Sequence, residues 1–295
     1  MTMKIVHHSK IGSSDIGGAT LVLGNFDGVH LGHRALIEAA KCHGGPVGAV
    51  TFEPHPRQFF EPDQPAFHLC SPEEKLARLV AAGCDFVVVL RFDEARAGQS
   101  AVSFLRDTLG RELRARHVVV GKDFSFGKER RGTAPILRRL GPRFGFSAEI
   151  VPKLCDGGEQ YSSSRARRYL ADGRVGRVSA ALGRPWQLPA RIDRIGAADL
   201  SLELLGDERL LPPPGDYLVA ISPDGLGWRN ASCRLETGDG ARRCEARGHV
   251  DGYPGMTLDL AFLSRIEPEL RRPPVKASSH RADDRGTGLS AMAGG

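Results

Sequence analysis

Apolar residues follow two alternating patterns along the first 150 residues of the chain. Short apolar runs that end in polar turns predict strands at residues 19–23, 47–52, 86–92, 118–121 and 148–151. Between these runs, helical spacing predicts helices at residues 33–43, 72–82, 101–113 and, more weakly, 134–145. This alternation is typical of a parallel sheet with helices on both faces, whose ligands bind beyond the carboxyl ends of the strands.

The pattern changes after residue 160. Capping serines and the closing residues Gly183 and Pro185 delimit two short predicted helices, at residues 165–172 and 175–182. Further along, short runs between turns rich in Pro, Gly and Asp predict strands at residues 217–221, 232–235, 244–248 and 256–263. We therefore expect an α/β domain at 1–186, a small antiparallel β domain at 187–270 and a disordered tail at 271–295.

Composition adds few constraints, because 41% hydrophobic and 26% charged residues are ordinary for a soluble globular protein. No apolar run approaches the length of a membrane span, and the N-terminus lacks the apolar segment of a secretion signal. We expect a cytoplasmic protein without a membrane partner. The six scattered cysteines show neither a C-x-x-C pair nor a histidine at zinc-ligand spacing, so reduced core thiols and no metal cluster are expected.

The formal net charge of +6 does not by itself indicate a nucleic-acid partner. The tail holds five basic and two acidic residues, and much of the remaining excess lies in two short clusters at 128–131 and 165–168. Short cationic clusters suit a small polyphosphate at least as well as a duplex, and no stacking aromatics alternate with the basic residues. No nucleic-acid partner is expected.

The segment GNFDGVHLGH, residues 24–33, stands where the first strand of the α/β pattern ends and its first helix begins. A helix N-terminus offers unpaired N–H groups and a partial positive charge, which favour phosphate. His30 and His33 are three residues apart and share one face of the first turn. Two imidazoles aimed at one spot can donate hydrogen bonds to a phosphate that gains charge during in-line displacement.

Three further segments follow predicted strands or open a helix. In TFEPHPR, residues 51–57, two prolines stiffen the loop, and His55 and Arg57 either face an anionic ligand or belong to a rigid crossover. In VGKDFSFGKERRGT, residues 120–133, Asp123 is a candidate for ordering ribose, water or a metal-bound phosphate. Its two phenylalanines, Phe124 and Phe126, belong either to the core or to a pocket wall. Its cations Lys128, Arg130 and Arg131 belong either to a loop that closes over a triphosphate or to a solvated turn.

In YSSSRAR, residues 161–167, serine hydroxyls and free N–H groups open a helix, and Arg167 adds a planar donor fork for phosphate. Taken alone, the segment also fits an ordinary capped helix.

Together, the four segments resemble the FMN adenylyltransferase half of the bacterial bifunctional riboflavin kinase/FAD synthetases. That family shows GxFDGVHxGH, TFxPHP, GxDFxFG and SSTxxR segments in this order, which stand here as GNFDGVHLGH, TFEPHPR, GKDFSFG and SSSRAR. The LGRPW at 182–186 is similar to the end of the family's domain. The resemblance covers about residues 21–186, and it departs from the family at Ser164, where threonine is usual.

The resemblance implies a Rossmann-like HxGH nucleotidyltransferase that transfers AMP from ATP to FMN, giving FAD and pyrophosphate. Mg²⁺ would arrive with ATP, without direct protein ligands. The implied catalytic residues are His30, His33 and Arg167. The implied ATP-binding residues are Gly24, Asn25, Phe26, Asp27, Gly28, Gly121, Asp123, Ser162, Ser163 and Ser164. The implied FMN-binding residues are Phe52, Pro54, His55, Pro56, Arg57 and Phe124.

The second half of the chain departs from the family. Bifunctional members continue with a riboflavin kinase barrel that opens with a glycine- and arginine-rich segment and a G-F-P-T-A-N element. Between Trp186 and Pro212 this sequence has neither, although PPPGDYLVAI and LDLAFLSRIEPE are similar to later barrel segments. We expect a degenerate antiparallel β-barrel without riboflavin kinase activity.

Two alternatives remain open at this point. The same HxGH chemistry can act on another phosphorylated acceptor, such as nicotinamide mononucleotide, phosphopantetheine or a glycerol phosphate. The second alternative is a non-catalytic flavin or nucleotide sensor, in which the altered C-terminal domain serves as a docking module.

Overall fold

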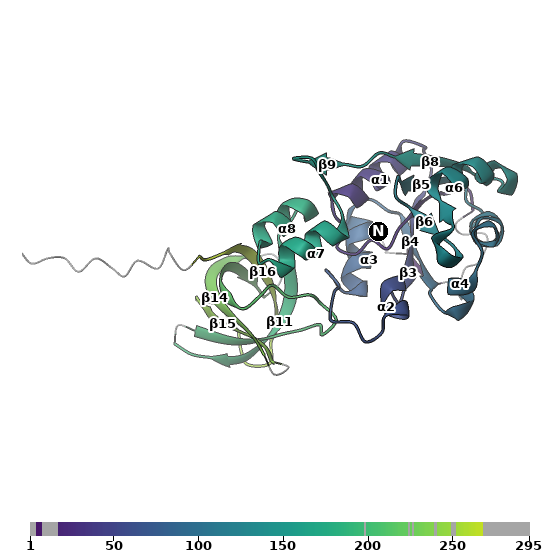
Figure 1. Cartoon of the computed structure of the whole chain (residues 1–295). Helices are drawn as coiled ribbons and strands as arrows, with labels where there is room; N and C mark the ends of the chain where they lie inside the picture. Colours follow the sequence, from purple (N-terminus) through teal and green to yellow (C-terminus); the bar gives the residue numbers. More distant parts are fainter. Residues whose placement is uncertain are drawn as a thin grey trace, which may run out of the picture.

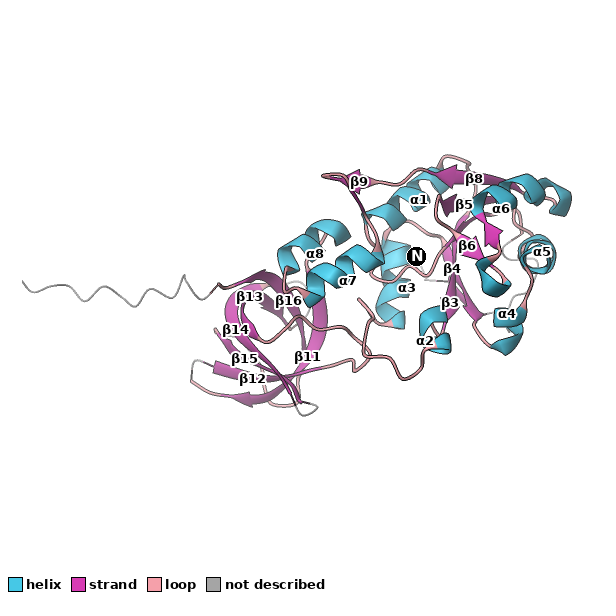
Figure 2. Cartoon of the chain, viewed as in Figure 1, coloured by secondary structure: helices cyan, strands magenta, loops and turns pink. Residues whose placement is uncertain are grey.

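A computed structural model of the chain describes residues 4–7, 17–197, 199–223, 225, 227–238, 241–248 and 252–267. Most of its strands belong to an open sheet or to a closed barrel, and a pair of helices lies between these two parts (Figures 1 and 2). Two further pairs of short strands, β6 (Ser125–Phe126) with β7 (Gly132–Thr133) and β9 (Cys155–Asp156) with β10 (Glu159–Gln160), form small separate sheets. The predicted tail at 271–295 lies outside the described residues. Within them, no helix is both long enough and apolar enough to span a membrane.

The open sheet has six parallel strands in the order β1-β4-β3-β2-β5-β8. Their bounds are β1 (Lys4–His7), β2 (Thr20–Leu23), β3 (Val47–Glu53), β4 (Phe86–Arg91), β5 (His117–Gly121) and β8 (Ser147–Val151). The five predicted strands are confirmed, and β1 is an addition at one edge. From β2 the chain first builds outward through β3 and β4 and then returns to the other side with β5, so the strand order reverses between β2 and β5. A crevice at the carboxyl ends of these two strands is the ligand position that such topology favours.

Helices cover both faces of the sheet, as predicted. On one face, α1 (Leu31–Lys41) and α3 (Pro72–Ala81) bury Ile37 and Leu79 against Val22 of β2. On the other face, a core that includes Leu21 and Leu23 receives α6 (Ala134–Leu140) and the segment 101–112. Because successive strand residues point to opposite faces, the continuously apolar β2 supplies both cores.

The predicted helix at 101–113 forms as a short α-helical turn, α5 (Ala101–Ser103), that widens into a π-helix, η2 (Phe104–Glu112). The remaining short elements of this half are α2 (Pro56–Phe60), α4 (Glu94–Gly98), β6 (Ser125–Phe126), η3 (Lys128–Arg130), β7 (Gly132–Thr133), η4 (Gly141–Phe144), β9 (Cys155–Asp156) and β10 (Glu159–Gln160).

Six antiparallel strands close the barrel in the order β11-β12-β15-β14-β13-β16. They are β11 (Trp186–Ile195), β12 (Asp199–Leu204), β13 (Gly215–Ser222), β14 (Arg229–Gly238), β15 (Ala241–Arg247) and β16 (Thr257–Arg265). The expected antiparallel β-barrel is thus confirmed, with β11 and β12 as strands that the sequence pattern did not predict. In β11 the buried positions Trp186, Leu188, Ala190 and Ile192 alternate with polar ones, but Pro189 in the run disfavours a strand assignment.

The two predicted helices before the barrel form as α7 (Ser163–Ala171) and α8 (Val175–Leu182). Leu170, Val178 and Leu182 belong to the same hydrophobic core as the barrel residues, rather than to the cores of the sheet. The helix pair is therefore packed on the barrel while its N-terminal end reaches the sheet domain (Figure 1).

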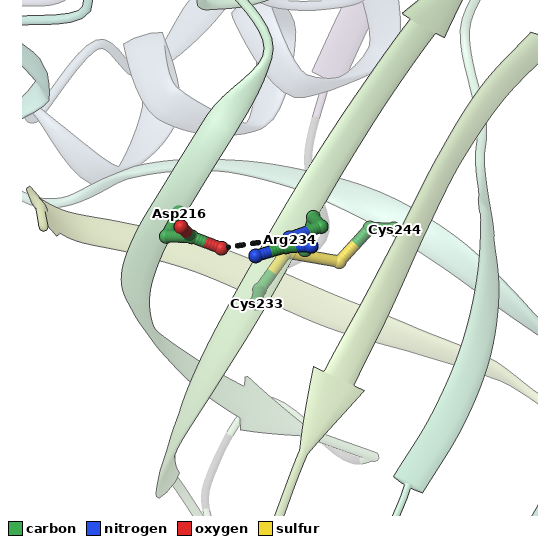
Figure 3. Close-up of a disulfide and its surroundings, with 4 residues drawn as sticks. All are labelled: Asp216, Cys233, Arg234 and Cys244. Atoms are coloured by element: carbon green, nitrogen blue, oxygen red, sulfur yellow. Dashed lines mark hydrogen bonds and ion pairs between the residues drawn. A yellow bond between two sulfur atoms is a disulfide. The ribbon is translucent and has the colours of Figure 1, made fainter. Parts of the chain in front are cut away.

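The expectation that all cysteines are reduced is wrong for one pair, because Cys233 and Cys244 form a disulfide. The two residues lie on adjacent strands β14 and β15, offset diagonally in the register, with Cα atoms 6.1 Å apart inside the barrel. Nearby, Arg234 pairs with Asp216 on the outer surface (Figure 3). The spacing of the two cysteines in the sequence does not indicate this disulfide, because only the register of the two strands brings the sulfurs together. The other four cysteines are free.

Candidate active site

The loop that joins β2 to α1 carries the GNFDGVHLGH segment and bends through several left-handed residues. Phe26, Gly28 and Val29 have φ angles of 54°, 78° and 43°. Gly28 is required for packing as well as for its conformation. A Cβ there would lie 3.0 Å from Leu69 and 3.1 Å from Leu182 of α8. The loop is thus held tightly between the segment before α3 and the helix pair on the barrel.

The two histidines of this loop lie against each other at the start of α1. Their ring centroids are 3.6 Å apart and the rings are nearly parallel, at 21°. His30 is the N-cap of the helix, and its Nδ1 accepts a hydrogen bond of 3.3 Å from the backbone N–H of His33. An Nδ1 that accepts has no proton when the ring is neutral, so the proton of neutral His30 sits on Nε2. The structure therefore brings the two rings together as the sequence predicted.

Both imidazoles are neutral at pH 7. Burial, assisted by the positive charge of Arg167, lowers the pKa of His30 from 6.5 to about 4. Burial also lowers the pKa of His33 well below 6.5, with His30, Lys75 and Arg167 acting in the same direction. The Nδ1 atom of His33 is buried without a hydrogen-bond partner among the described residues. Each ring can offer one N–H donor without carrying a charge.

A cavity of about 200 Å³ opens at the point where the strand order reverses between β2 and β5. Its wall is formed by the end of β2, the first turn of α1, the turn after β5, the segment after β8 and the start of α7. The lining residues are Leu23, Gly24, His30, Gly32, His33, Leu36, Gly121, Lys122, Asp123, Phe124, Val151, Pro152, Lys153, Leu154, Gln160, Tyr161 and Ser162. Predicted ATP-binding residues from three separate segments, among them Gly24, Gly121 and Ser162, thus meet at one cavity.

Asp27 lies at the centre of the loop, buried with 3% of its surface exposed. Its carboxylate accepts hydrogen bonds from the Leu69 N–H at 2.9 Å and from Nη2 of Arg167 at 2.7 Å. Its carbonyl accepts a bond of 2.8 Å from the Ser163 hydroxyl. Arg167 also donates through Nε to the carbonyl of Phe67 at 2.9 Å. Asp27, Ser163 and Arg167 therefore brace the loop and do not line the cavity.

The segment after β5 contributes Asp123 and Phe124 to the cavity wall. Asp123 is exposed and pairs with Lys153 at 2.5 Å. Phe124 lies beside Phe126, with ring centroids 5.5 Å apart, and packs on the sheet core.

The cations Lys128, Arg130 and Arg131 are exposed and do not line the cavity. Arg130 donates to Ser125, and Arg131 pairs with Glu129.

The TFEPHPR segment forms the end of β3, the strand next to β2, and the start of α2, and it stays outside the cavity wall. His55 is the N-cap of α2, and its Nδ1 accepts a bond of 3.1 Å from the Arg57 N–H. Burial, with Arg167 as the next cause, lowers the pKa of His55 to about 3. Phe52 packs edge-on against Phe92, and the exposed Arg57 lies 5.0 Å above the ring of Phe67. Arg167 acts on the pKa values of His30 and His55 alike, so the two segments are electrostatic neighbours.

Four other predicted site residues have simpler surroundings. Pro54 and Ser164 are exposed, and Pro56 is the first residue of α2. The backbone carbonyl of Asn25 accepts a hydrogen bond from the Thr51 hydroxyl.

The sequence analysis missed two residues that hold this region or add charge to it. Lys75 is buried and pairs with Glu53, the last residue of β3. Arg184 donates a 2.8 Å bond from Nη2 to the Gly28 carbonyl, and burial lowers its pKa to about 9. The signal for Lys75 was present, because it falls four residues before Leu79 on the apolar face of a predicted helix. Nothing in the local pattern marks Arg184.

Comparisons with known proteins show what the chain is similar to. Residues 13–165 match the family described as FAD synthetase. The chain is 37% identical over 223 residues to the bifunctional riboflavin kinase/FMN adenylyltransferase of Escherichia coli strain K12, covering 71% of this chain and 69% of that protein. It is 33% identical to the bifunctional riboflavin kinase/FMN adenylyltransferase of Pseudomonas fluorescens over 283 residues, 88% of each. A solved structure described as a macrolide-efflux protein from Streptococcus pneumoniae superimposes with a TM-score of 0.80 at 26% identity, covering 90% of this chain and 91% of that one.

The lowered pKa of His55 predicts how stability depends on pH. Between pH 6.5 and about 3, the unfolded chain binds a proton at this residue that the folded chain does not. The stability contributed by neutral His55 is therefore present above pH 6.5 and is lost as the pH falls through this window. Replacing His55 with Asn keeps a cap acceptor for the Arg57 N–H but removes the titration.

In H55N, the slope of unfolding free energy against pH should therefore decrease by up to about 1.4 kcal/mol per pH unit between pH 6 and pH 4. Urea unfolding at several pH values measures this slope. An H55N slope equal to that of the unchanged protein would show that His55 is already protonated in the folded state.

Proposed function

The chain belongs to the FAD synthetase family, and from this premise we propose that the histidine-lined cavity is where it transfers AMP from ATP to FMN. The products are FAD and pyrophosphate. The observation that carries this proposal is the stacked, neutral histidine pair at the N-terminus of α1, where the strand order reverses. A nucleotidyltransferase of this kind needs no enzyme nucleophile, because the phosphate of FMN attacks the nucleotide directly.

ATP would bind with its phosphates over the first turn of α1. The backbone N–H groups of that turn and its partial positive charge favour an anion. Gly24 and Gly32 line the cavity, and a Cβ on Gly32 would lie 3.0 Å from Nδ1 of His30, so this glycine leaves room for the ring. His30 and His33 would each donate one hydrogen bond from a neutral ring, and Ser162 at the start of α7 faces the same space.

In the reaction, an oxygen of the FMN phosphate forms a bond to the α-phosphorus of ATP. The bond between that phosphorus and the oxygen bridging to the β-phosphorus breaks, and pyrophosphate leaves with the electron pair. Negative charge grows on the oxygens around the α-phosphorus and on the leaving group. Donors held in place before the reaction stabilise this charge without reorganising. Neutral imidazoles also avoid the cost of burying two like charges side by side.

Use of ATP by this family suggests a divalent cation, and we propose Mg²⁺ bound to the ATP phosphates. Mg²⁺ prefers oxygen ligands and keeps several of its waters, so it needs few protein ligands. Asp123 is the carboxylate in the cavity wall, and the described residues form no cluster of three His, Cys, Asp or Glu suited to a metal. The donor set thus fits a cation carried by the nucleotide, with Asp123 beside it.

FMN would bind at the carboxyl end of β3, next to the cavity. Phe52, Pro54, His55 and Pro56 would form the wall of this site, the exposed Arg57 would supply a cation, and Phe124 would contribute from the wall of the cavity. Arg167 would act through its charge and through Asp27, because two of its nitrogens are already bonded to protein acceptors.

We also propose residues 1–186 as the transferase domain and 187–270 as the barrel domain. Both substrates are soluble metabolites, which favours a cytoplasmic reaction without a nucleic-acid or membrane partner.

Replacing both His30 and His33 with Ala should lower the rate of FAD formation by about 100-fold or more, since each removed donor acts mainly in the transition state. The assay follows FAD and pyrophosphate from FMN, ATP and Mg²⁺. His43→Ala is the matched control. This histidine lies just after the C-terminal end of α1 and contacts Glu149 and His117 instead of the cavity. A folded double variant that keeps the wild-type rate would refute the assignment, and binding of both ligands without turnover by the wild-type protein would favour a sensor.

Riboflavin kinase activity should be absent. The stretch between Trp186 and Pro212 contains β11, β12 and the turn that follows them, and its sequence has no glycine-rich phosphate loop. Riboflavin with ATP and Mg²⁺ should yield neither FMN nor FAD under conditions in which added FMN is converted to FAD. The appearance of either flavin nucleotide, followed by chromatography, would show that the barrel has kept the kinase reaction.

A further inference from the structure

The barrel contacts the sheet domain through a short segment, residues 67–70, that precedes α3. His68 pairs with the barrel turn that follows β12: its N–H donates to the Glu208 carbonyl at 3.1 Å, and its carbonyl accepts from the Leu210 N–H at 3.0 Å. The indole N–H of Trp186, the first residue of β11, donates to the Leu69 carbonyl at 3.0 Å. The barrel thus holds this segment at two neighbouring residues, His68 and Leu69.

The same segment holds the histidine loop. The Leu69 N–H donates to the Asp27 carboxylate, and the Phe67 carbonyl accepts from Arg167, which itself pairs with Asp27. The side chain of Leu69 lies against Gly28. Leu69 therefore connects the barrel with the loop that carries His30 and His33, in a chain of direct contacts.

Arg209 fixes the barrel turn to this segment. It is 4% exposed, and its Nη2 pairs with Glu74 in the first turn of α3 at 2.9 Å. Its Nη1 donates to the carbonyl of Gln187 in β11, while its own carbonyl accepts a bond of 2.9 Å from Arg242 in β15.

The turn is built around this side chain. Gly206 has a φ of 93°, and a Cβ there would lie 2.9 Å from Nε of Arg209. Arg209 is buried and its charge faces Glu74, which also lies 3.5 Å from Arg78 of α3, so the ion pair connects the turn to the first part of α3.

We propose that Arg209 is a positioning residue for adenylyl transfer, through which the barrel holds the Asp27 loop and its histidine pair in the reactive geometry. The inference rests on the proposed function of the cavity. It gives the barrel a task that does not depend on riboflavin kinase chemistry. Arg209 touches neither histidine, so its effect passes through Glu74 and the 67–70 segment.

The test compares Arg209→Met, Arg209→Lys, Glu74→Gln and the Arg209→Met/Glu74→Gln double variant in the full-length protein. Arg234→Met is the matched control, because it removes an exposed ion pair from the same barrel (Figure 3). Two quantities are measured: kcat and KM for FAD formation, and hydrogen exchange of the backbone amides of Leu69, His33 and the barrel strands.

Arg209→Met should lower kcat by about 10- to 100-fold, with a smaller change in the KM for ATP, because misplaced donors act mainly on the transition state. Arg209→Lys should recover part of the rate. The double variant should lose no more than the worse single variant, since both changes remove one contact. The Leu69 and His33 amides should exchange faster in Arg209→Met, while the barrel amides and the Arg234→Met control remain as in the wild type.

An unchanged kcat together with unchanged exchange at Leu69 would overturn the proposal. So would loss of protection throughout the barrel in both Arg209 variants, which would show a purely structural role. The exchange measurement does not depend on catalysis. If the wild-type protein makes no FAD, the proposed function fails, whereas the coupling of Arg209 to the loop is still tested.

Discussion

The buried carboxylate of Asp27 is the interaction on which the arrangement of the site depends. It joins three parts of the chain that are far apart in sequence: the histidine loop, the segment before α3 through Leu69, and α7 through Arg167. An isolated carboxylate at this depth would be costly to bury, and the hydrogen bonds that it accepts from an N–H and a guanidinium offset this cost. The loop conformation, the position of α7 and the packing of Gly28 between two domains all follow from these contacts.

Charge in the cavity is arranged to favour an incoming anion. The histidines are neutral because they are buried and because Arg167 stands near them, which holds the pKa of His30 at about 4. The negative charge of a bound polyphosphate would offset the positive charge near the two rings and raise the pKa of both histidines. Under the proposed function, the same cations that keep the two histidines neutral would also attract the phosphates of ATP. In the proposed mechanism the site responds to its substrate by strengthening donors that are already in place.

Local pattern predicted most of the fold and the segments of the site, but it could not supply contacts between distant residues. Five sheet strands, α3, α8 and the histidine pair all follow from periodicity and turn signals within about ten residues. The strand β1 has only two apolar residues, Ile5 and Val6, and Pro189 disfavoured a strand assignment for β11. The bonds from Leu69 and Arg167 to Asp27 cross 42 and 140 residues, so no spacing rule indicates that Arg167 braces a loop rather than facing the cavity. The disulfide was missed for the same reason, because it depends on strand register.

The central claim is that the neutral His30–His33 pair binds the phosphates of ATP. Nuclear magnetic resonance of ¹⁵N-labelled histidine side chains tests this claim most directly. The protein would be titrated at pH 7 with Mg²⁺ and the non-reactive analogue α,β-methylene-ATP. His43 and His117 serve as internal references. Their rings stack 4.6 Å apart at the amino end of β5, away from the cavity at its carboxyl end. The account predicts neutral rings at His30 and His33 in the free protein and shifts at both on binding, with the references unchanged. Saturable binding of the analogue that leaves the His30 and His33 resonances in place would contradict it.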